Sequence, residues 1–401
     1  MSQVCALVEG CTRRRNVNLH TFITFVDLRK AYDTVPHEAL FVKMEKYGVG
    51  QRMMAWLRSL YSTSSLRIRC GNGLSPRVSL QRGLRQGCPL SPILFDIFID
   101  DCLEGSRASG AVVPGCAERL SGLLFADDLA IIAGSPSDMA TSIGSFETWC
   151  NTWEMSVGIS KCGVMGIGEE AQQIAKTYEW PTLQGGQIPR VDSYLYLGCL
   201  LDFELNPETA CKHRERQGMK VLGMVSRLLA TGSVPVGLKR LIVKVVLVPC
   251  IVYGSEWFGM NKNNVAVLQR VLNKAIRLCV GASMTASWVP IEPLMSELGI
   301  EPIHVTASKR RARAFLKYRE MNSWISQMIN NPARQRKRTW VSLTKAWMKS
   351  LHIRDEDGVM VTEPSSELVC TEMLKSIAEK MGEKGSWGGK LYRRWELQKT
   401  N

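Results

Sequence analysis

Two aspartates stand side by side in the apolar run "LLFADDLAII", which extends from Leu123 to Ile132. Apolar runs interrupted by aspartate are typical of a β-hairpin, because aspartate is a favoured turn residue. A second apolar and β-branched run, "TFITFVD", ends at Asp27 and is followed by helix-forming residues. If these strands pair, Asp27, Asp127 and Asp128 converge at one end of them.

Clustered carboxylates repel one another, and their pKa values rise unless a cation neutralises them. Mg²⁺ prefers oxygen ligands, and Mn²⁺ binds the same kind of site. The three aspartates therefore predict a site for two Mg²⁺ ions, with Mn²⁺ as a substitute, of the kind that catalyses phosphoryl transfer. A plain hairpin turn remains the alternative for the Asp-Asp pair taken alone.

The composition limits the class of protein. Of 401 residues, 45% are hydrophobic and 22% charged, which is typical of a globular chain, and the net charge of +14 predicts a polyanionic partner. The basic clusters are candidates for phosphate contacts: Arg13 to Arg15, Lys309, Arg310, Arg311, Arg313, and Arg334 to Arg338. Solubility alone is the competing explanation for the charge.

Cysteine and hydropathy patterns argue against other classes. The 13 cysteines form no Cys-x-x-Cys pair and no zinc-finger spacing, which favours reduced thiols in an intracellular protein, nuclear or cytoplasmic. No signal peptide is visible, and no membrane partner is expected. The most apolar stretch, "LIVKVVLVPCIVYGSEW", is interrupted by Lys244 and Pro249, so a core helix that stops near Pro249 is expected.

Periodicity places the remaining elements. Helices are expected over residues 2–15, 36–50, 52–62, 91–105 and 137–155, a hairpin over 65–87, and strands over 163–168 and 193–202. From 206 to about 330 the pattern is helical throughout. The segment 331–401 mixes charge runs with glycine-rich stretches, so it is expected to pack loosely.

Five motifs in a fixed order carry a resemblance. They are "FVDLRKAYDTVPH", "GLRQGCPLSPILFDIFIDD", "FADDLAI", "SKCGVM" and "YLYLG". Together they resemble the reverse transcriptase domain of non-LTR (LINE-like) retrotransposons, strongly over residues 1–205 and weakly to about residue 303. The resemblance implies an α+β fold: a right-hand polymerase palm with an antiparallel sheet and helices on one face, partial fingers and a helical thumb.

The implied domains are a palm with partial fingers at 1–205, a helical thumb and connector at 206–330, and a basic C-terminal extension at 331–401. The family has an upstream fingers region that clamps the triphosphate, and Asp27 comes only about 26 residues after Met1. The chain is therefore expected to be N-terminally truncated and impaired in catalysis.

The resemblance also assigns catalytic roles. Asp27, Asp127 and Asp128 would hold the two metal ions, and Lys161 would act as proton donor near the pyrophosphate. The family usually has asparagine three residues before this lysine, where this chain has Gly158. A lone lysine in a turn is usually solvated, which is the alternative for Lys161.

Substrate contacts follow in the same way. Tyr32 would lie beneath the sugar of the incoming nucleotide and exclude a 2′-hydroxyl, unless it is a core aromatic residue. The other implied contacts with nucleotide or template are Leu28, Arg85, Gln86 and Gly87, the last three in a glycine-rich turn that could also be a simple loop. Tyr194, Leu195, Tyr196, Leu197 and Gly198 would form a hairpin that braces the primer, or an alternating core strand.

The function implied is that of an RNA-directed DNA polymerase, with an RNA template, a DNA primer and dNTPs as partners. Two alternatives stay open at this point. One is a catalytically impaired retrotransposon remnant that acts only in RNA binding, and the other is an RNA-binding protein similar to intron maturases.

Overall fold

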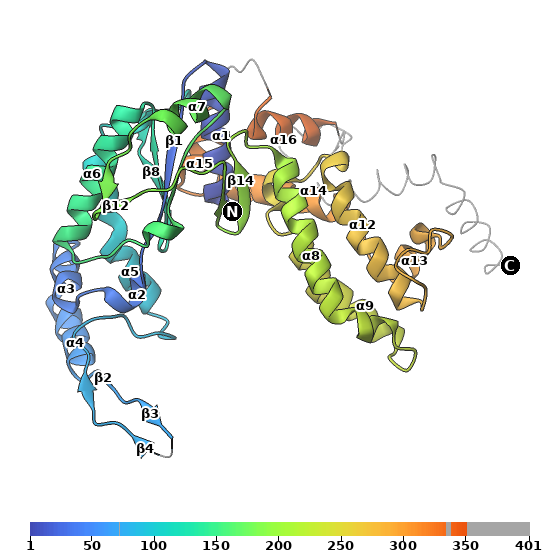
Figure 1. Cartoon of the computed structure of the whole chain (residues 1–401), viewed down its shortest axis with the longest axis horizontal. Coiled ribbons are helices and arrows are strands. Elements are labelled where there is room, and N and C mark those ends of the chain that lie inside the picture. Colours follow the sequence, from blue (N-terminus) through green and yellow to red (C-terminus); the bar gives the residue numbers. More distant parts are fainter. Residues whose placement is uncertain (72, 334–337, 351–401) are drawn as a thin grey trace, which may run out of the picture. The chain divides into compact units, whose positions relative to one another are not determined.

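The computed structural model of the chain describes residues 1–71, 73–333 and 338–350 (Figure 1). The chain divides into two compact units, of which one is the continuous segment Val17–Tyr194. The other combines Met1–Asn16 with the segment that begins at Leu195. The sequence predicted a first boundary at residue 205 and grouped the N-terminal helix with the sheet. The structure differs, because that helix packs among the C-terminal helices and binds the ends of two of them.

A four-stranded antiparallel sheet with strand order β10-β1-β9-β8 forms the centre of the unit 17–194. Its strands are β1 (Phe22–Asp27), β8 (Gly122–Phe125), β9 (Asp128–Ala133) and β10 (Gly163–Gly166). Every residue of β1 except Asp27 is buried. This burial explains why β1 is an almost continuous apolar run rather than an alternating one.

Helices cover one face of this sheet. Successive strand residues point to opposite faces, and the hydrophobic core takes every second one: Phe22 and Val26 from β1, Leu129 and Ile131 from β9. The helices that contribute to the same core are α3 (His37–Lys46), α4 (Gln51–Ser62), α5 (Ser91–Ile99), α6 (Pro136–Thr152) and α7 (Glu169–Thr177). The predicted α+β architecture, an antiparallel sheet with helices on one face, is confirmed.

A slender ribbon follows α4. In it β2 (Ser65–Leu66) pairs with β5 (Val78–Ser79), and β3 (Arg69–Cys70) pairs with β4 (Gly73–Leu74). Figure 1 shows that the ribbon leads away from the sheet, beyond α4. We call the described residues of Ser65–Leu80 the arm. The predicted hairpin is therefore present.

Short elements complete this unit. They are α2 (Ala31–Thr34), the 3₁₀ helices η1 (Asp100–Ser106) and η2 (Ile159–Lys161), and the paired strands β6 (Ala111–Val112) with β7 (Arg119–Leu120) and β11 (Thr182–Leu183) with β12 (Gly186–Gln187). At the boundary between the units, β13 (Ser193–Tyr196) and β14 (Cys199–Asp202) form a hairpin.

The other unit is helical, as its sequence pattern predicted. Its helices beyond residue 206 are α8 (Pro207–Ala230), α9 (Val236–Ile242), α10 (Val248–Ile251), α11 (Ser255–Phe258), α12 (Lys262–Cys279), α13 (Ile291–Glu297), α14 (Ile303–Arg319), α15 (Trp324–Asn330) and α16 (Trp340–Lys349). The two longest of them, α8 and α12, begin with asparagine caps: Asn206 accepts a hydrogen bond from the Glu208 amide, and Asn261 accepts one from the Asn263 amide.

The core helix that was expected to stop near Pro249 ends at Ile251, two residues later, so this prediction is confirmed. Ahead of the proline a π-helix, η3 (Val243–Leu247), joins α9 to α10. Hydrogen bonds in a π-helix span five residues rather than four. The wider turn accommodates the proline ring and its missing N–H.

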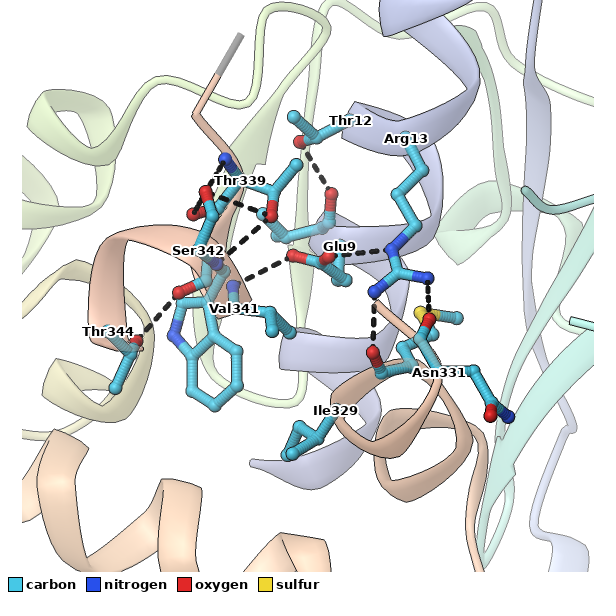
Figure 2. Close-up of polar contacts among 12 residues, drawn as sticks. Glu9, Thr12, Arg13, Ile329, Asn331, Thr339, Val341, Ser342 and Thr344 are labelled. Atoms are coloured by element: carbon cyan, nitrogen blue, oxygen red, sulfur yellow. Dashed lines mark hydrogen bonds and ion pairs between the residues drawn. The ribbon is translucent and has the colours of Figure 1, made fainter. Parts of the chain in front are cut away.

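The helix α1 (Ser2–Asn16) binds two other helices through a buried ion pair, shown in Figure 2. The Arg13 guanidinium donates to Glu9 at 2.7 Å and to the backbone carbonyls of Met328 and Asn331 at the end of α15. The second carboxylate oxygen of Glu9 accepts the Val341 amide at the start of α16 (3.0 Å). Glu9 and Arg13 thus each form hydrogen bonds with backbone groups that would otherwise stay unpaired at a helix end.

The start of α16 is well packed, where loose packing was expected for 331–401. Thr339 caps the helix through a reciprocal hydrogen-bond pair with Ser342, and Trp340 and Val341 are buried. Residues 334–337 and 351–401 of the predicted extension lie outside the described residues.

Three arginines of the predicted phosphate-binding clusters are buried. Arg13 and Arg14 lie inside the helical unit. Arg311 donates to the backbone carbonyls of Trp257, Gly259 and Trp340 and to the Thr344 hydroxyl. The prediction that these side chains contact phosphate is therefore wrong, because all three are buried. Donors of Arg13 and Arg311 are also used by backbone carbonyls inside the protein. Three basic residues of the last cluster, Arg334, Arg336 and Lys337, lie outside the described residues.

Among the residues described, twelve cysteines are free thiols and most are buried. The helices described include none long and apolar enough to cross a membrane.

Candidate active site

The ends of β1, β8 and β9 bring the three predicted aspartates to one place. Asp27 is the last residue of β1 and lies directly opposite Asp128, the first residue of β9, in the antiparallel register. Phe125 pairs with Asp128, so Ala126 and Asp127 are the two residues of the turn between β8 and β9. Ala126 adopts a positive φ of 51°, a conformation that few residues other than glycine take.

The electrostatics of the site reflect this convergence. Although Asp128 as a residue is exposed, partial burial of its carboxyl group raises its pKa, and the negative charges of Asp127 and then Asp27 raise it further. Burial also raises the pKa of Tyr194 to about 12, with smaller contributions from Cys162, Asp27 and Asp128. The site therefore carries an excess of negative charge, and a bound cation would stabilise it.

Lys161 lies at this site, at the end of η2. Its ammonium nitrogen is 3.5 Å from Oδ2 of Asp27, with the lysine side chain 73% exposed and the aspartate side chain 28% exposed. The Tyr194 hydroxyl donates to the backbone carbonyl of Lys161 at 2.8 Å. The lysine is thus solvated and also paired with one of the three carboxylates.

The side chains as placed do not form a ready metal cluster. In the described part of the chain, no three His, Cys, Asp or Glu side chains gather closely enough to hold a metal ion. The donor set of three carboxylates fits Mg²⁺ or Mn²⁺ by its chemistry, and the raised pKa of Asp128 fits it too. Asp27, Asp127 and Asp128 would hold such an ion, and the Asp27 carboxylate is at present paired with Lys161.

Gly158 packs directly against the catalytic candidate Asp27. Its amide donates to the Asp27 carbonyl at 2.8 Å, and Leu28 pairs with Val157 in an isolated bridge. A Cβ at position 158 would lie 2.6 Å from Oδ2 of Asp27. The glycine that departs from the family pattern therefore leaves the space that this carboxylate occupies.

Tyr32 lies on α2 and is half-buried. Its ring stacks on Phe95 of α5, with centroids 4.5 Å apart and planes inclined by 16°. Burial raises the pKa of its hydroxyl, with further contributions from Asp96 and Asp127. Tyr32 thus packs against the core on one side, while its hydroxyl lies within the electrostatic reach of Asp127.

The glycine-rich turn holds α2 in place. The amides of Gly83 and Leu84 donate to the carbonyls of Val35 and Tyr32, at 2.9 and 2.7 Å. Gly83 has a φ of 93°, and a Cβ there would lie 2.9 Å from the Asp33 carbonyl oxygen. Gln86 donates to the Asp33 carboxylate at 2.7 Å. The turn therefore fixes the residues on both sides of Tyr32.

The other predicted substrate contacts differ in exposure. Arg85 is exposed but donates to the Leu60 carbonyl and the Ser64 hydroxyl at the end of α4. Gly87 has a positive φ of 82° and open space around it. Leu28 is only 3% exposed, so its side chain belongs to the core rather than to a substrate surface.

The predicted primer hairpin is present as β13 and β14. Tyr194 stacks on Phe25 with centroids 4.2 Å apart and nearly parallel planes. Tyr196 is buried and Leu195 is 51% exposed. Leu197 and Gly198 form the turn with positive φ values of 46° and 71°. The hairpin thus contains both core and exposed side chains. This is compatible with a primer-bracing hairpin and with an alternating core strand, the two interpretations of its sequence.

Sequence reasoning missed several residues of this site. The stacking partner Phe95 carried no local signal, and Gly158 was noticed only as a departure from the family pattern. The contacts of both residues join segments far apart in the chain. Asp33 stands inside the "AYDT" motif next to Tyr32, and this position was the available signal for its role. Cys162, whose sulfur lies 3.5 Å from the Asp27 amide nitrogen, follows Lys161 directly.

The family of the chain follows from a comparison with known proteins. A model described as "Reverse transcriptase (RNA-dependent DNA polymerase)" matches residues 3–224 of the 401. The chain belongs to the reverse transcriptase family. The resemblance that its motifs carry to non-LTR retrotransposon enzymes is confirmed.

Curated relatives of this reverse transcriptase family member include retrotransposon proteins. A Pol polyprotein from a type-1 R2 element of Popillia japonica is 26% identical over 48% of this chain and 33% of its own length. One from the R2DM element of Drosophila melanogaster is 22% identical over 73% of this chain and 28% of its own. The RNA-directed DNA polymerase from the Drosophila melanogaster element jockey is 24% identical over 64% and 28%. The chain therefore spans about a third or less of these relatives.

Proposed function

We propose that this chain is the catalytic core of an RNA-directed DNA polymerase from a non-LTR retrotransposon, which adds dNTPs to the 3′-hydroxyl of a primer. The observation that carries the proposal is the register of β1 and β9, which sets Asp27 opposite Asp128 and beside the turn that holds Asp127. Membership of the reverse transcriptase family supports the same chemistry.

The three aspartates would hold the two divalent ions. When bound, such ions lower the pKa of the primer hydroxyl and stabilise charge on the leaving pyrophosphate. Asp27 would exchange its contact with Lys161 for the ions, which frees the lysine ammonium. Lys161 then has a charge and a proton to offer to the pyrophosphate, at a position 3.5 Å from Asp27 in the present arrangement.

Tyr32 would select the sugar of the nucleotide. The glycine-rich turn and the Phe95 ring hold α2 and the tyrosine in a fixed position. A ring fixed in this way excludes a 2′-hydroxyl by overlap, so dNTPs would be preferred over ribonucleotides.

The remaining parts of the chain would hold the nucleic acid. We assign the arm, α3 and α4 to a partial fingers region, the β13/β14 hairpin to the primer terminus, and the helices α8 to α12 to a thumb. An RNA template and a DNA primer are the proposed partners. The free cysteines support an intracellular location.

Primer extension on poly(rA)/oligo(dT) with Mg²⁺ tests the proposal. Asp127→Asn keeps the shape of the side chain and removes its charge, so extension should be lost while binding of the primer-template changes little. Asp192→Asn removes an exposed carboxylate that pairs with Lys176 elsewhere in the same unit, and it should extend normally. RNA binding without any extension by the wild-type chain would favour an RNA-binding remnant instead.

A further inference from the structure

The segment that contains the arm carries an unusual concentration of positive charge. From Lys46 to Phe95 the sequence has eight lysines and arginines and no aspartate or glutamate. This segment therefore contributes more than half of the net charge of +14. A region with one sign of charge over such a length creates a field that attracts polyanions.

Intramolecular contacts account for only some of these cations. Arg58 pairs with Glu38 and Glu45, Arg82 pairs with Glu154, and Lys46 lies 3.9 Å from Glu104. Arg67, Arg69 and Arg77 have no ion pair or hydrogen bond with other described residues. All three lie in the arm and are exposed.

The two ladders of the arm keep these charges near one another. Leu66 pairs with Val78 in β2 and β5, and Arg69 pairs with Leu74 in β3 and β4. Arg67 directly follows Leu66 and Arg77 directly precedes Val78, so both arginines flank the same residue pair. Like charges close together on a ribbon repel one another, and a bound anion would reduce this repulsion.

The arm also exposes apolar side chains that no other element covers. Leu66, Ile68, Leu74 and Val78 are each between 49% and 60% exposed. An apolar surface interleaved with arginines and lacking carboxylates is typical of a nucleic-acid contact rather than of a solvated loop.

The shape of the arm decides which nucleic acid fits. The major groove of B-form DNA admits a two-stranded β-ribbon and is about 8.5 Å deep, whereas the arm extends over six or seven residues, roughly 20 Å. The major groove of A-form RNA is too narrow for side chains to read. Single strands are usually held by stacking on aromatic rings, and the arm has no aromatic residue.

We propose that the arm binds double-stranded DNA by entering its major groove. Arg67, Arg69 and Arg77 contact phosphates and base edges, and the exposed aliphatic side chains contact thymine methyl groups. This surface is separate from the three aspartates, so the proposal adds a duplex-DNA site to the polymerase function proposed above.

Binding of the full chain to three labelled probes of equal length tests the proposal: a DNA duplex, an RNA duplex and single-stranded DNA. Fluorescence anisotropy is measured in EDTA, without dNTPs, over a range of salt concentrations. The variant with Arg67→Gln, Arg69→Gln and Arg77→Gln should bind the DNA duplex at least 100-fold more weakly. Its slope of log affinity against log salt should fall by about three, because each phosphate contact contributes about 0.9.

A matched control removes three charges from the same unit away from the arm, by Arg107→Gln, Lys176→Gln and Arg190→Gln, and should retain the affinity for the DNA duplex. The measurement is repeated in the Asp127→Asn chain, so its result is independent of polymerase activity. Unchanged DNA binding in the arm variant would overturn the proposal. Equal loss for all three probes, or a loss confined to single strands or the RNA duplex, would overturn it as well.

Discussion

The carboxylates at the ends of β1 and β9 lie close enough to repel one another. The arrangement proposed to bind metal ions therefore lowers the stability of the metal-free protein. Asp128 has a pKa raised by burial and by the charges of Asp127 and Asp27. The folded chain therefore holds a proton on Asp128 more tightly than the unfolded chain does. Stability is unaffected below the unfolded pKa of about 3.9 and falls as pH rises from there through the raised folded value.

Removal of this charge should stabilise the metal-free protein. In EDTA at pH 7, Asp128→Asn is expected to raise the midpoint of thermal unfolding, and the gain should shrink as the pH falls toward 4. Calorimetry across this pH range measures the difference from wild type. The gain should be absent in Asp192→Asn, since that carboxylate has a pKa lowered by hydrogen bonds to Lys176 and Gln172. A wild type more stable than Asp128→Asn at pH 7 would contradict the electrostatic argument.

Tyr32 offers a second test at the scale of a residue. Tyr32→Ala should raise ribonucleotide incorporation relative to deoxyribonucleotide on the order of tenfold or more, because relief of about 1.4 kcal/mol of steric overlap is already a factor of ten. Tyr32→Phe keeps the ring that stacks on Phe95 and should preserve the wild-type ratio. Single-nucleotide extension measures both ratios. An unchanged ratio in the alanine variant would leave Tyr32 as a core residue only.

Gly158 should matter because of the space it leaves. In Gly158→Ala the Asp27 carboxylate must move away from a Cβ that would lie 2.6 Å from it. A misplacement of about 1 Å in a catalytic group can cost about 100-fold in rate, so primer extension should slow by about that factor. The affinity for Mn²⁺, measured without substrate, should weaken as well. Gly144→Ala is the control, because a Cβ on α6 at that position meets nothing within 4 Å. Equal behaviour of the two variants would remove Gly158 from the site.

The sequence could predict part of this site but not all of it. The aspartates were recognisable because each follows an apolar strand, and antiparallel pairing brings such strand ends together. Gly158 was noticed only as a departure from the family pattern. Its contact with Asp27 joins residues 131 positions apart, and no local pattern encodes such an approach.

At the scale of elements, α1 shows how buried charge joins helices. Glu9 and Arg13 are 0% and 2% exposed, four residues apart on one helix. Each also binds backbone groups at the end of another helix. Loss of one partner of a buried pair leaves an uncompensated charge in a medium of low polarity.

Glu9→Ala should therefore lower the free energy of unfolding by about 3–5 kcal/mol. Glu204→Ala is the matched control, since it breaks the exposed pair with Arg15 in the same unit and should cost no more than about 1 kcal/mol. Urea unfolding followed by tryptophan fluorescence measures both. Similar losses in the two variants would mean that the buried network contributes little.

The elements themselves were largely predictable. Apolar periodicity found the strands β1, β9 and β10 and most helices, because one face of each packs on a core. The basic run at the end of α1 was misinterpreted as a surface, although the spacing of Glu9 and Arg13 was a visible sign of an ion pair. The carbonyls that bury Arg13 come from residues more than 300 positions later, beyond the range of any local pattern.

At the scale of the whole molecule, the sequence identified the family but not the division of the chain. The five motifs follow one another along Val17–Tyr194 and into the β13/β14 hairpin. Their order therefore indicated the approximate extent of the sheet unit. The other unit is discontinuous, since it takes its first helix from one end of the chain and the rest from beyond Leu195. Sequence order alone does not indicate that two distant segments share one core.

This discontinuity has a consequence for synthesis on the ribosome. The helix α1 is synthesised before the rest of its unit, but the backbone groups that bind its Glu9 and Arg13 belong to Met328, Asn331 and Val341. Domains generally fold as units while translation proceeds at about 5–20 residues per second, so α1 waits roughly 15 to 70 seconds for these partners. The sheet unit is complete well before then. A nascent chain thus folds the sheet unit first and completes the helical unit last.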